Sequence, residues 1–217
     1  MSYRKTHVEL ILVRHGETEW NATEVFRGRA DIPLNEHGLE QARLLGEYLK
    51  SEKIDAVYSS PLQRAVKTAE TIAAHHKLDV NIVENLNDIH CGEWEGLSLE
   101  QVRERYEDVY QDWLDTPEQV KLPGGEGLDD VKNRALPFVQ DAVTRVGEGN
   151  IALVSHRAVI KVLIAALLTL DNSAFWNFKI DNAGITRFFF DGNRAVLTSH
   201  NDTSFLRPLN REPLKDF

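Results

Sequence analysis

The sequence has a single cysteine, Cys91, among its 217 residues. One thiol cannot form an internal disulfide, and a chain without disulfides suits a reducing compartment. A long hydrophobic run is missing too. The apolar stretch near the N-terminus ends at Val13, which makes it too short for a membrane span. No small-residue cleavage site follows it. We therefore expect a cytoplasmic protein with no membrane partner.

Cofactor and partner signatures are also missing. There is no P-loop and no glycine-rich dinucleotide fingerprint, so no nucleotide cofactor is expected. The histidines outside the strand ends discussed below show no metal-ligand spacing such as H-E-x-x-H, so no metal is expected either. The net charge of −9 argues against a nucleic-acid partner. It leaves open a small anionic ligand held by a local cluster of arginines.

What is present is an ordinary globular composition, with 42% hydrophobic and 27% charged residues. Short apolar runs alternate with helical periodicity, and this alternation predicts an α/β fold with a mostly parallel sheet covered on both faces. Strands are expected at 8–13, 54–58, 80–83 and 151–154, with a closing hairpin of 188–190 and 195–198. Helices are expected at 38–50, from Ser60 with Pro61 in its first turn, from a Ser98–Gln101 capping box to about Trp113, at 128–146, and after Ser155.

Polar residues that could carry chemistry follow these strands directly. Parallel sheets bind ligands beyond the carboxyl ends of their strands. In chain order, the residues at those ends are Arg14 and His15, then Ser59 and Arg64, then Asp88, and finally Ser155, His156 and Arg157. The concurrence of two histidines with several arginines favours an active site over isolated structural roles.

These residue types suit phosphoryl transfer. An imidazole nitrogen can attack phosphorus and form a phosphohistidine, which divides one difficult displacement into two easier ones. Arginine stays charged, and its fork matches two phosphoryl oxygens at once. A carboxylic acid must then protonate the leaving alkoxide and later activate water. Arg14, His15, Arg64 and His156 supply the first parts, and carboxylates between 84 and 95 could supply the last.

The motifs in "LVRHGETEWN", "SSPLQRAVKTAE", "LNDIHCGEWEG", "GGEG" and "VSHRAVIKVL" resemble, in order, the blocks of the histidine phosphatase superfamily, the phosphoglycerate mutase-like proteins, and most closely its phosphatase branch. The resemblance implies a three-layer α/β/α sandwich, forming one domain over residues 1–217 with a small cap inserted at about 84–125. It also implies activity without a cofactor or metal. Because members of the family are often dimers, a homodimer is a possible assembly.

The resemblance assigns roles by position. His15 would be the phosphorylated nucleophile, while Arg14, Arg64 and His156 would bind the phosphoryl group. Further substrate contacts would come from Asn21, Arg27, Gly28 and Arg157. The chain departs from the family at two of these positions. Asp88 stands where the phosphatase branch usually has the glutamate that donates the proton, with Glu93 and Glu84 as the fallback donors. Arg157 stands where the family often has glycine, so it either favours a second anionic group on the substrate or pairs with an acidic neighbour.

The sequence therefore predicts a metal-independent phosphomonoesterase, a phosphoric monoester hydrolase of the histidine acid phosphatase type. It would act on a small phosphorylated metabolite through a phosphohistidine. A cofactor-dependent phosphoglycerate mutase and an α-ribazole phosphatase are the nearest alternatives. An inactive phosphate-binding regulatory module is the alternative from a different class.

Overall fold

The sheet forms the centre of the computed structural model, which describes residues 7–209. The outermost parts of the predicted domain, 1–6 and 210–217, lie outside the described residues. Within the described part, six strands follow the spatial order β3-β2-β4-β1-β5-β6. Their bounds are β1 His7–Arg14, β2 Ala56–Ser59, β3 Val80–Ile82, β4 Glu148–Ser155, β5 Ile185–Asp191 and β6 Arg194–Asp202.

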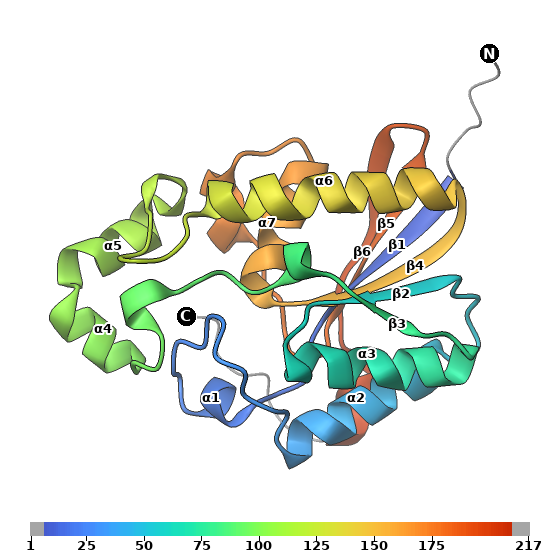
Figure 1. The fold of residues 1–217 in the computed structure, drawn as a ribbon, viewed down its shortest axis with the longest axis horizontal. Helices are drawn as coiled ribbons and strands as arrows, with labels where there is room; N and C mark the ends of the chain where they lie inside the picture. The colour runs from blue at the N-terminus through green and yellow to red at the C-terminus, as the bar shows by residue number, and fades with distance from the viewer. Residues whose placement is uncertain (1–6, 210–217) are drawn as a thin grey trace.

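The sheet is mostly parallel, as predicted. The pairs β2–β3, β2–β4 and β1–β4 are parallel, whereas β5 and β6 form the antiparallel hairpin at one edge. Helices α2 (Glu36–Leu49) and α3 (Gln63–His76) cover one face of the sheet, while α6 (Leu128–Val146) and α7 (Arg157–Leu167) cover the other (Figure 1). The three-layer α/β/α architecture is thereby confirmed.

Alternation along β1 explains why both faces are buried. Leu10 and Leu12 belong to the core under α6 and α7, whereas Ile11 and Val13 belong to the core under α2 and α3. Successive side chains of a strand point to opposite faces, so a nearly continuous apolar run is what a doubly covered strand needs. The aliphatic run before Arg14 therefore belongs to a central strand.

The segment 84–125 contains short helices and no described strand. After the 3-10 turns Glu84–Leu86 and Gly92–Trp94 come α4 (Leu99–Arg105) and α5 (Glu107–Asp115), then the turn Pro117–Gln119. The capping box of Ser98 and Gln101 is confirmed at the start of α4. The single helix predicted to Trp113 is instead broken at Tyr106, whose φ of −134° and ψ of 37° lie outside the helical region. Figure 1 shows α4 and α5 standing apart from the sheet, at the end where the parallel strands finish.

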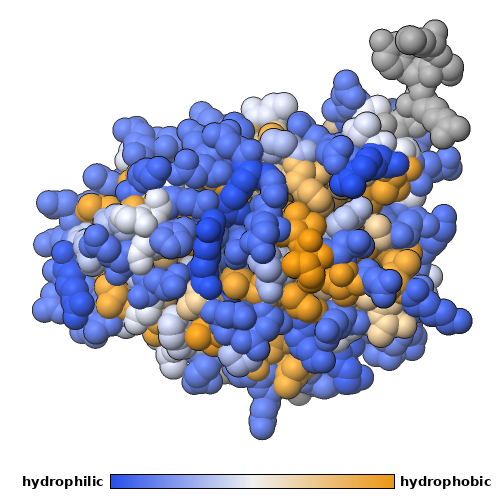
Figure 2. All heavy atoms as spheres, in the orientation of Figure 1, coloured by the Kyte–Doolittle hydropathy of each residue, from blue (hydrophilic) through white to orange (hydrophobic). Residues whose placement is uncertain are grey.

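The helices and the surface of the described residues are the features relevant to a membrane, which the sequence predicts the protein not to bind. No helix among residues 7–209 is long and apolar enough to cross a membrane. Hydrophobic surface gathers between α6 and α3 along the edge of the sheet (Figure 2). In the edge strand β3, the side chain of Ile82 is 51% exposed.

A close approach of two backbones explains the glycine of the "RHG" motif. A Cβ atom on Gly16 would lie 2.5 Å from the carbonyl oxygen of Gly38, and a Cβ on Gly38 would lie 2.0 Å from that of Glu17. Neither position has room for a side chain, so the turn after β1 packs directly on the first turn of α2. This contact fixes the path of the chain on leaving His15.

Candidate active site

The register of the sheet brings the two histidines together. Arg14 at the end of β1 pairs with Ser155 at the end of β4, so His15 and His156 leave neighbouring strands side by side. The His15 amide donates to the Ser155 carbonyl at 3.1 Å. The centroids of the two imidazole rings lie 5.1 Å apart, with the ring planes at 58°. Both side chains are buried, so the protein shields the two imidazole rings from bulk water.

The contacts of His15 leave one ring nitrogen available as a nucleophile. Nδ1 lies 2.6 Å from the carbonyl oxygen of Gly16. A carbonyl can only accept, so Nδ1 carries the proton and Nε2 keeps its lone pair. Burial lowers the pKa of His15, and the charge of Arg64 lowers it further. The ring therefore stays neutral at neutral pH, which is the form that can attack phosphorus.

Asn182, which the sequence analysis missed, holds the backbone of the nucleophile. Its Nδ2 donates to the His15 carbonyl at 3.2 Å and lies 3.5 Å from Oδ1 of Asn21. The residue is buried and comes from the loop before β5, far from His15 in sequence. No local pattern around "DNAG" reveals this contact, because it depends on the antiparallel pairing of β5 with β1.

His156 is oriented by Ser60, and this corrects a prediction. Helix α3 begins at Gln63 with Leu62 as its N-cap, so the expected capping role of Ser60 and Pro61 is wrong. The Ser60 hydroxyl instead lies 2.7 Å from Nε2 of His156 and accepts the Leu62 amide at 3.4 Å. A serine shortly before a helix is typical of an N-cap. In the folded chain, however, the Ser60 hydroxyl lies next to the buried imidazole of His156, which follows the neighbouring strand β4.

The second nitrogen of His156 faces the acidic side of the site. Its Nδ1 is buried without a hydrogen bond in the described structure, at 3.5 Å from Oδ2 of Asp88. Burial is the largest cause of a lowered pKa for His156, followed by the charge of Arg64. The free site therefore favours a neutral ring, in which Nδ1–H is the donor when the Ser60 hydroxyl donates to Nε2.

Arg64 is the most enclosed cation of the site, with a fully buried side chain. Its Nη1 donates to the Ala30 carbonyl at 2.7 Å, and its Nη2 donates to the Gly28 carbonyl at 2.9 Å and to Oδ2 of Asp88 at 3.3 Å. Burial lowers its pKa despite the nearby Asp88. Its Nε has no partner among the described residues, so a buried donor remains for an anion.

Arg14, the last residue of β1 and the neighbour of His15, is also buried. Its Nη1 donates to the Ile180 carbonyl at 2.6 Å, which anchors the guanidinium to the loop before β5. The charge of Arg14, like that of Arg64, lowers the pKa of both His15 and His156. The structure therefore groups Arg14, Arg64 and the two histidines, as the sequence predicted.

Asp88 is the carboxylate that reaches this group. Its Oδ2 contacts both Arg64 and Nδ1 of His156, and its Oδ1 accepts the Ile89 amide at 2.9 Å. The fallback donors point elsewhere. Glu93 is exposed and accepts the Tyr106 hydroxyl at 2.9 Å, while Glu84 is exposed beside Asn87. The geometry favours Asp88 although its side chain is one methylene shorter than glutamate.

The loop carrying Asp88 is fastened by Arg134, a second residue that the sequence analysis missed. Arg134 on α6 donates to the carbonyls of Asn85, Asn87 and Asp88 at 2.8, 2.7 and 3.0 Å. It also forms a two-point ion pair with Glu126, both contacts being 3.0 Å. The available signal was the "GGEG" block, whose glutamate is Glu126 and which lies shortly before this arginine.

The remaining predicted substrate contacts divide into two groups. Asn21 is buried, and its Oδ1 accepts from the amide and hydroxyl of Thr18 at 3.0 and 2.9 Å, which shapes the turn at α1 (Glu19–Ala22). Arg27, Gly28 and Arg157 line a small hollow next to Asp88. Their roles, like the catalytic assignments, stay predictions.

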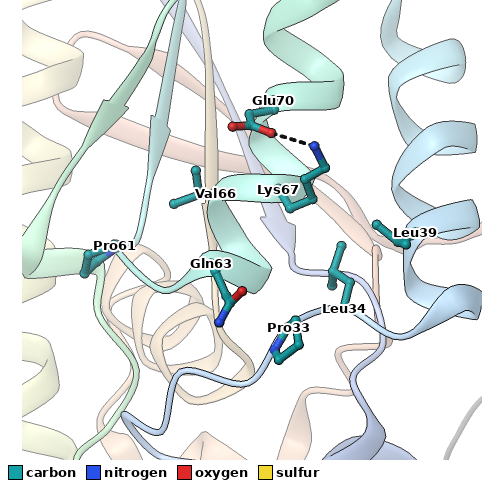
Figure 3. Close-up of a pocket in the computed structure, with 8 residues that line it drawn as sticks. All are labelled: Pro33, Leu34, Leu39, Pro61, Gln63, Val66, Lys67 and Glu70. Atoms are coloured by element: carbon teal, nitrogen blue, oxygen red, sulfur yellow. Dashed lines mark hydrogen bonds and ion pairs between the residues drawn. The ribbon is translucent and has the colours of Figure 1, made fainter.

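A larger hollow lies outside the site. It measures about 600 Å³ and is lined by Pro33, Leu34, Leu39, Pro61, Gln63, Val66, Lys67 and Glu70. Figure 3 shows its walls coming from α3, from the first turn of α2 and from the loops before these two helices, with Lys67 and Glu70 drawn as a pair. The Lys67–Glu70 ion pair measures 3.0 Å. It has no histidine or arginine in its lining, so size alone does not mark the site of chemistry. Among residues 7–209, no group of three or more histidine, cysteine, aspartate or glutamate side chains could hold a metal ion.

Comparisons with known proteins give this geometry a context. Residues 10–203 match the family described as the histidine phosphatase superfamily, branch 1. Phosphoserine phosphatase 1 of Hydrogenobacter thermophilus is 37% identical over 199 residues, covering 92% of this chain and 94% of the relative. The adenosylcobalamin/alpha-ribazole phosphatase of Escherichia coli is 32% identical over 174 residues, covering 80% and 86%.

A solved structure of a phosphatase is also similar to this chain. Phosphoserine phosphatase from Entamoeba histolytica, in complex with 3-phosphoglyceric acid, superposes with a TM-score of 0.84 at 33% identity, covering 92% of this chain and 99% of that one. Sequence and fold therefore agree over nearly the whole described chain.

Proposed function

The chain belongs to the histidine phosphatase superfamily, branch 1, and from that premise we propose that it hydrolyses small phosphate monoesters through a phosphohistidine on His15. The single observation that carries this proposal is the pairing of two neutral, buried imidazoles 5.1 Å apart beside the buried guanidinium groups of Arg14 and Arg64. Relatives that are named as phosphatases of small phosphorylated metabolites support it.

In the first step, the substrate phosphoryl group lies between Arg14, Arg64 and His156. Nε2 of His15 attacks phosphorus and forms the N–P bond while the P–O bond to the leaving group breaks. The proton of Asp88 moves to the departing alkoxide oxygen, so the product is a neutral alcohol group. The arginines stabilise the charge that spreads over the phosphoryl oxygens.

In the second step, water attacks the phosphohistidine. Asp88, now a carboxylate, accepts a proton from the water as the new O–P bond forms and the N–P bond breaks. Inorganic phosphate leaves, and His15 and Asp88 return to their starting states. No step needs a metal or an organic cofactor, because the arginines provide positive charge and the neutral His156 provides an N–H donor.

The test is phosphate release from a panel of monoesters in the presence of a chelator, combined with trapping of ³²P on the protein during turnover. We expect release by the wild-type protein and acid-labile, base-stable label that is lost in His15→Ala. Release that persists unchanged in His15→Ala would overturn the mechanism. Activity that requires 2,3-bisphosphoglycerate and yields an isomer rather than phosphate would support the mutase alternative instead. Absence of both label and release in the folded protein would support a binding module.

A further inference from the structure

The 180–184 loop, which precedes β5, binds the backbone of the proposed nucleophile. The His15 carbonyl accepts two hydrogen bonds from this loop, one from Nδ2 of Asn182 and one from the Ala183 amide, each at 3.2 Å. Ala183 has a positive φ of 56°, which is uncommon for a residue that carries a side chain. A backbone in such a conformation persists only where its surroundings hold it.

The same loop anchors the arginine next to the nucleophile. Nη1 of Arg14 donates to the Ile180 carbonyl at 2.6 Å, and the Arg14 amide donates to the Gly184 carbonyl at 3.2 Å. The 180–184 loop therefore contacts both the proposed nucleophile and one of the arginines assigned to the phosphoryl group. A shift of this loop would displace the two groups together.

Asn201 on β6 holds this loop in place from outside the site. Its Oδ1 accepts the Asp181 amide at 2.8 Å, and its Nδ2 donates to Oδ2 of Asp181 at 2.8 Å. The Asp181 side chain is 12% exposed and also pairs with Lys179 at 3.1 Å. Within the loop, the Asp181 carbonyl accepts the Gly184 amide at 3.0 Å. The two-point contact of Asn201 thus fixes the residue at which the loop turns.

An irregularity in the edge hairpin explains why Asn201 reaches the loop. The pairing of β5 with β6 changes register between Ile185 and Arg187. Asn201 has a positive φ of 50°, a conformation that asparagine tolerates better than most residues, and its amide donates to Oγ1 of Thr186 at 3.2 Å. Bulges of this kind are frequent beside active sites, where they redirect a side chain. Here the redirected side chain is the one that binds Asp181.

Building on the proposed phosphatase function, we propose that Asn201 is a positioning residue for the attack on phosphorus. Through Asp181 it fixes the 180–184 loop. Through that loop it sets the place of the His15 imidazole and of the Arg14 guanidinium relative to the phosphoryl group. Small errors in the distance between a nucleophile and its target are costly to the rate, even when their cause lies far from the chemistry.

The proton donor has a separate support. The loop that carries Asp88 is fastened from the opposite face of the sheet by Arg134 of α6, which donates to the Asp88 carbonyl at 3.0 Å. Loss of the Asn201 contacts should therefore slow the formation of the N–P bond and leave proton transfer to the leaving group unaffected. This distinguishes a defect in attack from a defect in acid catalysis.

Two substitutions of Asn201 test the proposal. Asn201→Asp keeps the acceptor for the Asp181 amide but sets a carboxylate oxygen against Oδ2 of Asp181. Asn201→Gly removes both contacts without adding charge, and glycine adopts the left-handed backbone at no steric cost. Single-turnover labelling of His15 is measured with acetyl phosphate, whose leaving carboxylate needs no proton, and with glycerol 3-phosphate, whose leaving alkoxide does. We expect labelling to slow by about 10- to 100-fold, by the same factor for both donors. Inhibition by inorganic phosphate should weaken as well, because Arg14 is displaced too.

A rescue variant and a control separate positioning from stability. Adding Asp181→Asn to Asn201→Asp restores the side-chain hydrogen bond with donor and acceptor exchanged, so labelling should return to within about 3-fold of the wild type. The control is Asn150→Asp. Nδ2 of Asn150 donates to the Lys53 carbonyl at 2.6 Å near the start of β4, at the end of the strand away from the site. This variant should be less stable but should label His15 at the wild-type rate.

Each result is read in protein that thermal melting shows to be folded. Unchanged labelling rates in Asn201→Asp and Asn201→Gly would overturn the positioning role. So would a loss that is much larger with glycerol 3-phosphate than with acetyl phosphate, because the effect would then act through Asp88. An equal loss in Asn150→Asp would also overturn it, by showing that any destabilisation slows the step.

The two proposals fail in different ways. If the wild-type protein becomes labelled on His15 and the Asn201 variants label equally fast, only the positioning role is wrong. If the folded wild-type protein takes no label from either donor, the phosphohistidine mechanism is wrong, and the positioning of His15 for that attack falls with it.

Discussion

The Ser60 hydroxyl lies 2.7 Å from Nε2 of His156 and also accepts the Leu62 amide at 3.4 Å. The amide uses a lone pair of the hydroxyl oxygen, which leaves the hydroxyl proton to point at Nε2. A neutral His156 then carries its proton on Nδ1, the atom that faces Asp88 and the proposed phosphoryl site. Ser60 thus selects the tautomer with which His156 can donate to phosphate.

Ser60→Ala should remove this control. We expect kcat/KM to fall by about 2- to 10-fold and inhibition by inorganic phosphate to weaken, because half or more of the neutral imidazoles could then carry the proton on the wrong nitrogen. The acid limb of the pH–rate profile should also shift, which a purely structural defect would not cause. Ser59→Ala is the matched control, since the Ser59 hydroxyl donates only to a backbone carbonyl. Equal effects of the two substitutions on phosphate inhibition would argue against tautomer selection.

Asp88→Asn should lose activity in a way that depends on the leaving group. For an alkyl ester, whose leaving oxygen needs a proton, we expect kcat to fall by about 100- to 10,000-fold. Acetyl phosphate releases a stable carboxylate, so the first step should be affected much less. Single-turnover labelling of His15 with each substrate measures this step. Glu93→Gln and Glu84→Gln are the controls, and a leaving-group-dependent loss in either of them rather than in Asp88→Asn would reassign the proton donor.

The buried histidines should make stability depend on pH. The folded-state pKa of both His15 and His156 lies well below the ordinary value of 6.5. Below about pH 6.5 the unfolded chain therefore binds protons that the folded chain does not. The free energy of unfolding should be at its full value above that pH and decrease as the pH falls, by about 1.4 kcal/mol per pH unit for each ring.

Urea unfolding at a series of pH values between 7.5 and 5, in the chelator-treated protein, measures this dependence. His156→Gln should show a shallower decrease than the wild type, because one of the two buried rings is gone. An identical slope in the two proteins would show that His156 titrates normally when folded.

Arg134→Met should loosen the loop that carries Asp88. The substitution removes three contacts to backbone carbonyls and leaves the partly buried Glu126 without its bidentate partner. We expect the free energy of unfolding to fall by about 2–4 kcal/mol. We also expect kcat to fall more than the rate of His15 labelling by acetyl phosphate, since only the proton donor is displaced.

The control for this loss is Arg43→Met. Arg43 pairs with Glu40 on the exposed side of α2, and surface pairs contribute little. The unfolding midpoint of this variant should match that of the wild type. A similar destabilisation by both substitutions would mean that the Arg134 contacts have no special structural weight.

Local patterns predicted the elements on which the site is built. The aliphatic run before Arg14 determined a doubly buried strand, and the Ser98–Gln101 box determined the start of α4. Helix α6 runs over the predicted Leu128–Val146 with Pro137 inside it. Hydrophobic periodicity and capping involve residues within a few positions of one another, so they can be recognised in the sequence alone.

Local patterns misled where a side chain had a distant partner. Ser60 has the sequence context of a cap, but it bonds to an imidazole 96 residues further along the chain. Asn182 showed no pattern, and Arg134 had no signal beyond the nearby "GGEG" block, because their partners are backbone carbonyls that only the folded chain brings near. Such contacts depend on which strands become neighbours, and short-range propensity does not encode that choice.

The sequence by itself determined the α/β architecture, the family, and the identity of the residues at the strand ends, because each of these rests on local periodicity or on a contiguous motif. The tertiary structure alone decided which carboxylate reaches the histidines, which nitrogen of each imidazole is available, and that Arg27 and Arg157 share one hollow. Those properties depend on distances of a few ångströms between residues far apart in the chain, such as His15 and His156, which the register of β1 with β4 brings together.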